Sequence, residues 1–226
     1  MSYEANKQAN TINHEPIGPD SFKSFVESWG VVGDSPSERL QAMLGLGLDG
    51  LALFLTDINR CIQGEEETQI HDSTMQVGGV DMVPIKNRYD LFKDFYEQLN
   101  LAANNINPER AGDALAMVIT TLHPFKEANG RTGRAVSFML HDLYDDQADY
   151  AKNFSYVTAS RDQAKAKGLA SHELAAPFLK LSSLDLGQNL DLQSFGSVKD
   201  YFTRLLSEED GNLYSGTFGY AALRKE

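Results

Sequence analysis

The chain has little cysteine, little positive charge and no long hydrophobic run. Its single cysteine among 226 residues, Cys61, excludes an intramolecular disulfide framework and a zinc site of several thiolates, so we expect it in the core. The longest apolar stretch, Leu44 to Leu55, is too short to cross a bilayer and contains Asp49. Lys and Arg number 20 against 32 Asp and Glu, and the net charge of −12 argues against nucleic-acid binding through a broad basic surface.

The polar N-terminus lacks the basic start and apolar middle of a secretory signal. We therefore expect a cytoplasmic protein without a membrane segment. Acidic runs at 64–67, 145–149 and 207–210 are typical of solvated loops or helix ends. The length and the hydrophobic fraction of 42% suit one main domain with small attachments.

Start signals and apolar periodicity predict an all-α fold with one β-hairpin. Ser35, Pro36 and Glu38 form a helix start, and an apolar stripe over 51–62 continues at helical spacing to a stop at Gly64. Asn107-Pro108-Glu109 opens another helix, and the helix from Gly130 is apolar on most sides and is therefore expected to be buried. Further helical segments are predicted at 91–99, around 160–180 and near 198–207.

Composition divides the chain into three expected parts. Residues 1–33 are polar and predict a loosely packed arm, 34–180 predict the main domain, and 181–226 predict an extension with a short helix and a polar tail. Within the main domain, β-favouring residues flank Gly78-Gly79, which predicts a short hairpin over about 74–85.

The stretch TLHPFKEANGRTGR, which begins at Thr121, is the most informative part of the chain. Two arginines follow the predicted helix start at Gly130, where partial positive charge and unpaired N–H groups disfavour cations. Small or turn-tolerant residues at 128–130 allow backbone amides to form an anion-binding nest that fits phosphate. Arg131 and Arg134 lie three apart, hence on one face, and their guanidinium groups suit phosphate oxygens.

Two further side chains of this stretch could take part in a reaction. A carboxylate at Glu127, beside bound phosphates, suits Mg²⁺, and His123 at the end of the preceding helix can serve as a general base. Taken singly, each feature has a simpler explanation: a histidine as a helix cap, Asn-Gly as a turn, arginines as solvated helix residues. Phe125 is a core anchor in either case. Together, the residues suit transfer from a nucleotide to a hydroxyl.

The run from His123 to Arg134 resembles the signature of the Fic family, H-P-F-x-[D/E]-[G/A]-N-G-R-x-x-R, at every specified position. Helix order and the upstream hairpin extend the likeness over roughly residues 35–180. Fic proteins are mostly AMP transferases that move the AMP of ATP onto a Ser, Thr or Tyr hydroxyl of a target protein. The resemblance implies that His123 deprotonates this hydroxyl and that Glu127 holds Mg²⁺ against the α- and β-phosphates. It also implies that Ala128, Asn129 and Gly130 bind phosphates, with Arg131 at the β/γ region and Arg134 at the γ-phosphate. Phe125 would fix the loop to the core.

The hairpin, with Val77, Gly78, Gly79 and Val80, corresponds by this resemblance to the family's flap, which aligns the target backbone by strand pairing. Family members that phosphorylate can carry lysine where this chain has Gly130, so glycine favours AMP transfer. Two alternatives remain: UMP or phosphocholine transfer from the same site, and a nucleotide-binding module without catalysis, against which the intact histidine argues.

Regulation departs from much of the family. Many members carry an inhibitory [S/T]-x-x-x-E-[G/N] helix, and the only Ser or Thr here with Glu four residues later is Thr11, whose Glu15 precedes Pro16. Proline disfavours helical geometry at the residue before it. We therefore expect a separate antitoxin-like inhibitor or no inhibitor.

Overall fold

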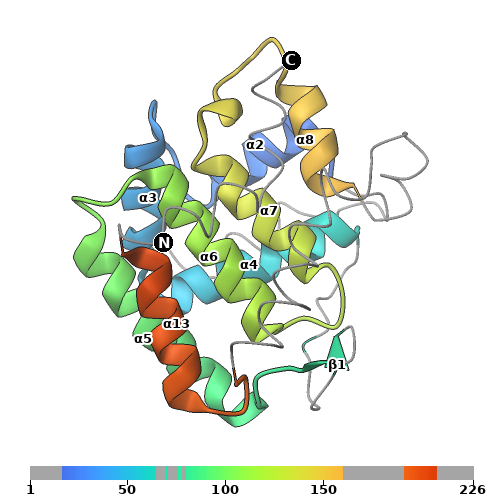
Figure 1. Cartoon of the computed structure of the whole chain (residues 1–226). Coiled ribbons are helices and arrows are strands. Elements are labelled where there is room, and N and C mark those ends of the chain that lie inside the picture. The colour runs from blue at the N-terminus through green and yellow to red at the C-terminus, as the bar shows by residue number, and fades with distance from the viewer. Residues whose placement is uncertain (1–16, 65–69, 71–75, 78–79, 160–190, 208–226) are drawn as a thin grey trace.

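The computed structural model describes residues 17–64, 70, 76–77, 80–159 and 191–207, and this part of the chain is mostly helical, as predicted (Figure 1). Two helices, α6 and α7, lie side by side at the centre, and the others surround them. The helices are α2 (Pro19–Ser28), α3 (Pro36–Gly45), α4 (Gly47–Gln63), α5 (Ile85–Ala102), α6 (Pro108–Leu122), α7 (Asn129–Met139), α8 (Tyr150–Thr158) and α13 (Phe195–Leu206), with a 3₁₀ turn at Asp142–Tyr144.

Both predicted helix starts are confirmed. The Ser35 hydroxyl accepts a hydrogen bond from the amide of Glu38, whose carboxylate in turn accepts from the amide of Asp34. At α6, the Asn107 side chain accepts from the Glu109 amide. These bonds satisfy amides that have no partner inside the helix, so the local signals fix where α3 and α6 begin.

The helix expected from Pro36 to Gly64 is instead two helices. Gly47 has φ of 75°, a left-handed conformation that glycine adopts without steric cost, and α3 and α4 meet there at 111°. The expected stop at Gly64 is confirmed, with φ of 69°. Among the described residues, no single helix has the length and apolar character to cross a membrane, and only the bent pair of α3 and α4 together meets those criteria.

The expectation of a loose arm over 1–33 is wrong for residues 19–31. They contain α2, whose Phe22, Phe25 and Val26 are buried, and the Phe22 ring lies 4.9 Å from that of Phe154. The apolar positions in this segment follow helical spacing, and burial of two aromatic rings outweighs the polar residues between them. Glu15 lies outside the described residues.

The C-terminal half also differs in part from the prediction. The helix near 198–207 is confirmed as α13, but it packs on α5, where Phe202 meets Phe95 at 5.8 Å between ring centroids, so it belongs to the same core. The structure adds α8 at Tyr150–Thr158, which the acidic run before it obscured. The helix predicted around 160–180 lies outside the described residues.

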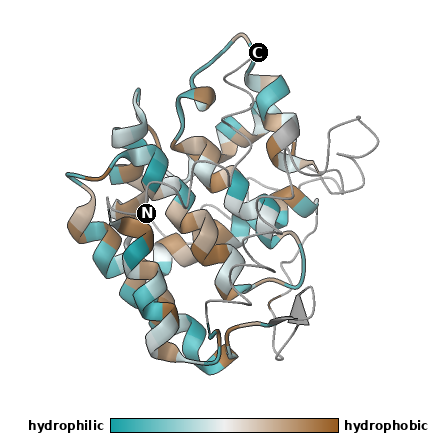
Figure 2. Cartoon of the chain, viewed as in Figure 1, coloured by the Kyte–Doolittle hydropathy of each residue, from teal (hydrophilic) through white to brown (hydrophobic). Residues whose placement is uncertain are grey.

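The central pair of helices is largely buried and closely packed. Every α6 residue from Ala111 to Leu122 is buried, and Figure 2 shows hydrophobic residues along α6. A Cβ on Gly133 of α7 would lie 3.0 Å from the carbonyl oxygen of Ala116. The close approach of the two helices therefore requires glycine at this position.

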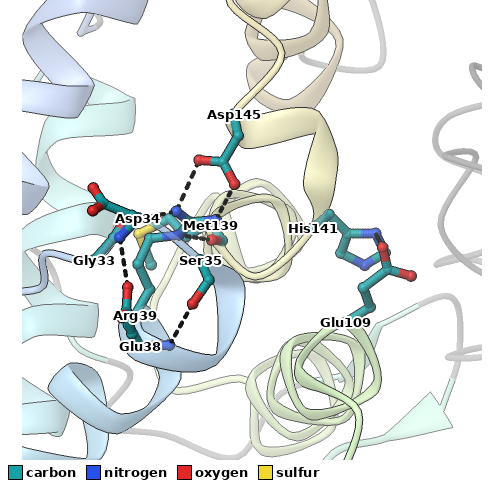
Figure 3. Close-up of polar contacts among 9 residues, drawn as sticks. All are labelled: Gly33, Asp34, Ser35, Glu38, Arg39, Glu109, Met139, His141 and Asp145. Carbon is teal, nitrogen blue, oxygen red and sulfur yellow. Dashed lines mark hydrogen bonds and ion pairs between the residues drawn. The ribbon is translucent and has the colours of Figure 1, made fainter.

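Buried polar contacts hold the C-terminal end of α7. Arg39 of α3 is 2% exposed, donates to the Met139 carbonyl and forms a bidentate ion pair with Asp145 (Figure 3). On the other side, Asp113 of α6 accepts from Ser137 and lies 3.0 Å from Nε2 of His141. Burial raises the pKa of Asp113 above its ordinary value. The far end of α7 is thus fixed to both α3 and α6.

Strand structure is limited, among the described residues, to a short antiparallel pair. In β1 (Gln76–Val77) and β2 (Val80–Asp81), Gln76 lies opposite Asp81 and Val77 opposite Val80. Gly78 and Gly79, between the strands, lie outside the described residues. The pairing agrees with the expected hairpin, while its role as a flap stays a prediction.

Candidate active site

The predicted catalytic loop joins α6 to α7 and has a left-handed residue at each end. His123, the residue after α6, has φ of 49°, and Ala128, the residue before α7, has φ of 59°. Among the described residues these are the only two non-glycine positions with positive φ. This conformation costs roughly 1–2 kcal/mol for a residue with a Cβ, so surrounding contacts must hold it.

The His123 ring is half-buried and contacts the helix that it follows. Its Nδ1 lies 3.3 Å from the carbonyl oxygen of Thr120. A proton on Nδ1 would be donated to this carbonyl, which leaves the lone pair of the neutral ring on Nε2. This is the tautomer that a general base acting through Nε2 requires.

Asn129 closes the loop on itself. Its Oδ1 accepts from the amide of Phe125 at 3.0 Å, and its Nδ2 donates to the Phe125 carbonyl at 2.7 Å. Both residues are 3% exposed. The carboxamide of Asn129 thus braces the loop, and the Phe125 ring connects it to the core.

Glu127 is exposed and precedes the left-handed Ala128. Within the described part of the chain, no group of three His, Cys, Asp or Glu side chains could hold a metal ion. A single accessible carboxylate nevertheless fits Mg²⁺, which commonly takes one or two protein carboxylates and completes its shell with substrate phosphates and water. The donor set is therefore compatible with a metal that arrives with a nucleotide.

Arg134 is 7% exposed and is held by α8. Its Nε donates to the Val157 carbonyl at 2.8 Å and its Nη2 to the Ala159 carbonyl at 2.9 Å. Its Nη1 lies 3.8 Å from the position of a Cβ on Gly130, beside the first turn of α7. The guanidinium thus bridges the carboxyl end of one helix and the amino end of another. Arg131, in the same turn of α7, is half-buried.

Asn59, a fully buried residue of α4, contacts the loop and was not among the predicted site residues. Its Nδ2 donates to the Glu127 carbonyl at 3.0 Å and to the Thr132 hydroxyl at 2.9 Å. A signal was present, since Asn59 follows Leu55 by four residues and so falls on the apolar stripe of α4, where a polar side chain needs a partner.

An apolar pocket of about 310 Å³ adjoins the loop between α4, α5 and the end of α6, with Pro124 and Phe125 in its wall. Ile70 and Tyr89, which are exposed, also line it, and Ile70 pairs with Phe125 in an isolated antiparallel bridge. The loop therefore has an apolar flank toward α5 and a polar flank toward α7 and α8.

Residues 52–141 match the model of the Fic/DOC family, a span that includes α4 from its second turn, the strand pair, the loop and α7. Neither the curated proteins nor the solved structures contain a match to the chain. The family match covers less than half of the chain and supports a Fic domain over residues 52–141.

Proposed function

We propose that this Fic domain is a protein adenylyltransferase that moves AMP from ATP to a Ser, Thr or Tyr hydroxyl of a target protein. The loop geometry is the observation that supports it most. One short loop combines a histidine whose Nδ1 lies 3.3 Å from a backbone carbonyl, an exposed carboxylate and the start of a buried helix, and the Asn129 side chain holds this loop by two internal hydrogen bonds.

In the proposed reaction, the target hydroxyl oxygen attacks the α-phosphorus of ATP. The bond from the α-phosphorus to the oxygen that bridges to the β-phosphate breaks, pyrophosphate leaves, and the hydroxyl proton goes to Nε2 of His123. The Thr120 carbonyl keeps the ring oriented through Nδ1. A general base of this kind typically contributes about 10²–10⁴-fold in rate.

The triphosphate would bind at the amino end of α7. Backbone amides of Ala128, Asn129 and Gly130 would face the phosphates, because amides in the first turn of a helix point out of it and the helix dipole favours negative charge there. Arg131 would hold the β/γ region and Arg134 would reach the γ-phosphate through Nη1. Glu127 would hold Mg²⁺, which supplies positive charge against the phosphates when bound.

The target would dock at the strand pair. An extended target segment that pairs with this hairpin would gain main-chain hydrogen bonds, which suits recognition of a backbone beside the site. The proposal includes ATP as the substrate and Mg²⁺ as the metal that binds with it. It also includes a separate inhibitory partner.

Labelled ATP tests the reaction with His123→Ala and a matched control. We expect label from α-³²P-ATP and none from γ-³²P-ATP on protein, loss of about 10²-fold or more in His123→Ala, and largely unchanged ATP affinity, because the base contacts the incoming hydroxyl. Lys126→Ala, at an exposed position of the same loop, should keep transfer. Label retained from the γ position would identify a kinase, and transfer only from UTP or CDP-choline would identify a different donor; either result refutes AMP transfer.

A further inference from the structure

We propose that Asn59 is a positioning residue that fixes the catalytic loop and, through Glu127, the metal-bound nucleotide. This inference rests on the proposed function for its nucleotide, whereas its structural basis is independent of it. Asn59 belongs to α4 and lies outside the signature run from His123 to Arg134, although within the residues that match the family model.

The hydrogen bonds of Asn59 are those of a brace. Its side chain is fully buried, where an unpaired amide would cost stability. The two Nδ2 hydrogens reach two acceptors, the Glu127 carbonyl and the Thr132 hydroxyl, and Oδ1 accepts from Nε2 of Gln63 at 2.7 Å. The Glu127 carbonyl can only accept a hydrogen bond, so it fixes which end of the Asn59 amide faces the loop.

The two acceptors lie on either side of the left-handed Ala128. Glu127 directly precedes it, and Thr132 is tied to it because the Thr132 amide donates to the Ala128 carbonyl at 2.8 Å. One amide group of α4 therefore holds both flanks of the residue whose conformation turns the chain into α7. Asn129 holds the earlier part of the loop through Phe125, so the two asparagines act on different segments.

This arrangement links Asn59 to nucleotide binding. Orientation of the Glu127 backbone determines where its carboxylate lies, and the conformation of Ala128 determines where the first amides of α7 point. Without the hydrogen bond to the Glu127 carbonyl, the left-handed turn is held by fewer contacts and the loop is ordered in a smaller fraction of molecules. Nucleotide binding must then also order the loop, which lowers the observed affinity.

The test compares Asn59→Asp and Asn59→Leu with Ser137→Ala. Aspartate keeps the acceptor for Gln63 but cannot donate to the Glu127 carbonyl, and leucine removes the bonds without adding charge. Ser137→Ala is the matched control, since it removes a buried hydrogen bond from α7 to Asp113 without touching the loop. The measurements are MgATP affinity by calorimetry, the Mg²⁺ concentration for half-maximal binding, and hydrogen exchange of amides 128–132.

We expect both Asn59 variants to bind MgATP about tenfold more weakly, to need more Mg²⁺ and to exchange the loop amides faster. Ser137→Ala should bind within about twofold of wild type even if its melting temperature falls equally. Equal affinities and equal loop exchange in wild type and the Asn59 variants would overturn the proposal, as would an equal loss of affinity in Ser137→Ala.

Gln63→Met is the variant to use if substitutions at Asn59 prevent folding. Gln63 is half-buried and reaches the loop only through Asn59 among the hydrogen bonds described above. We expect about a threefold loss of affinity and faster loop exchange, and no change in either would refute the brace. If wild type binds no MgATP, the proposed function fails, while loop exchange in the variants still decides the role of Asn59.

Discussion

Replacement of Arg134 tests whether this residue only binds phosphate or also stabilises the fold. Two nitrogens of its guanidinium donate to carbonyls at the end of α8, at 2.8 and 2.9 Å, in a position that is 7% exposed. Hydrogen bonds from charged groups are worth about 1.5–3 kcal/mol each, and the two share one group, so Arg134→Ala should lower the free energy of unfolding by about 3 kcal/mol. For a chain of this size, that corresponds to a fall of about 6–12 °C in melting temperature.

The assay pairs thermal unfolding with ATP binding. Arg134→Ala should lose both stability and affinity, and amides of Tyr150–Thr158 should exchange faster because α8 loses its contact with α7. Arg134→Lys keeps the charge but has no guanidinium fork, so it should recover about half of the lost stability. Arg131→Ala, in the same turn, should weaken ATP binding with a smaller change in melting temperature.

One result would refute this reasoning. If Arg134→Ala loses ATP affinity but melts within about 2 °C of wild type, the guanidinium is not held by α8 in solution. Arg134 would then be a phosphate ligand alone, and the position of α8 would be irrelevant to nucleotide binding.

Two further predictions concern the packing of α6 against α7. Gly133→Ala should lower the free energy of unfolding, measured in urea, by about 1–3 kcal/mol, because the new Cβ would lie 3.0 Å from the backbone oxygen of Ala116. Gly130→Ala is the control, since its Cβ would lie 3.8 Å from Nη1 of Arg134, an ordinary contact distance, and it should cost less than about 1 kcal/mol. Equal losses of stability in the two variants would contradict the packing argument. Burial raises the pKa of Asp113, so the stability that this group contributes is present below its ordinary pKa and is lost as pH rises through the higher native value. Asp113→Asn keeps an Oδ1 acceptor and should remove this loss; urea unfolding from about pH 4 to about pH 8 tests it, and parallel profiles for the two proteins would disprove it.

Local signals predicted the helix starts because the interactions that define them are local. The Ser35 cap bonds to a residue three positions away, and the Asn107 cap to one two positions away. The break at Gly47 was harder to predict, because glycine occurs at 45, 47 and 50 and the local sequence does not show which of the three adopts the left-handed conformation. In α2, the aromatic partners of Phe22 and Phe25 come from distant segments, so their burial could not be inferred from the polar residues between them.

In the candidate site, too, the features carried by neighbouring residues were predictable and the contacts between distant segments were not. Its loop residues form one continuous run, so a resemblance to a family could identify them together. The supports of the loop come from elsewhere: Asn59 lies 68 residues before Glu127, and the carbonyls that hold Arg134 lie 23 and 25 residues after it. Contacts between residues so far apart in the sequence leave no local pattern that identifies the two partners. Only the fold therefore shows which polar residues contact the loop.

Two residues that the resemblance assigns to phosphate are already engaged with the protein. The Asn129 carboxamide makes two bonds to Phe125, and the Arg134 guanidinium makes two to α8. Phosphate would then meet the backbone amides of the first turn of α7 and side chains that the protein already holds in place. Because these groups lie on a braced loop, nucleotide binding need not order them first, and the conformational cost is met by the fold instead of the ligand. A site of this kind is sensitive to its supports, so loss of Asn59 or displacement of α8 should weaken nucleotide binding without removing a single proposed phosphate ligand.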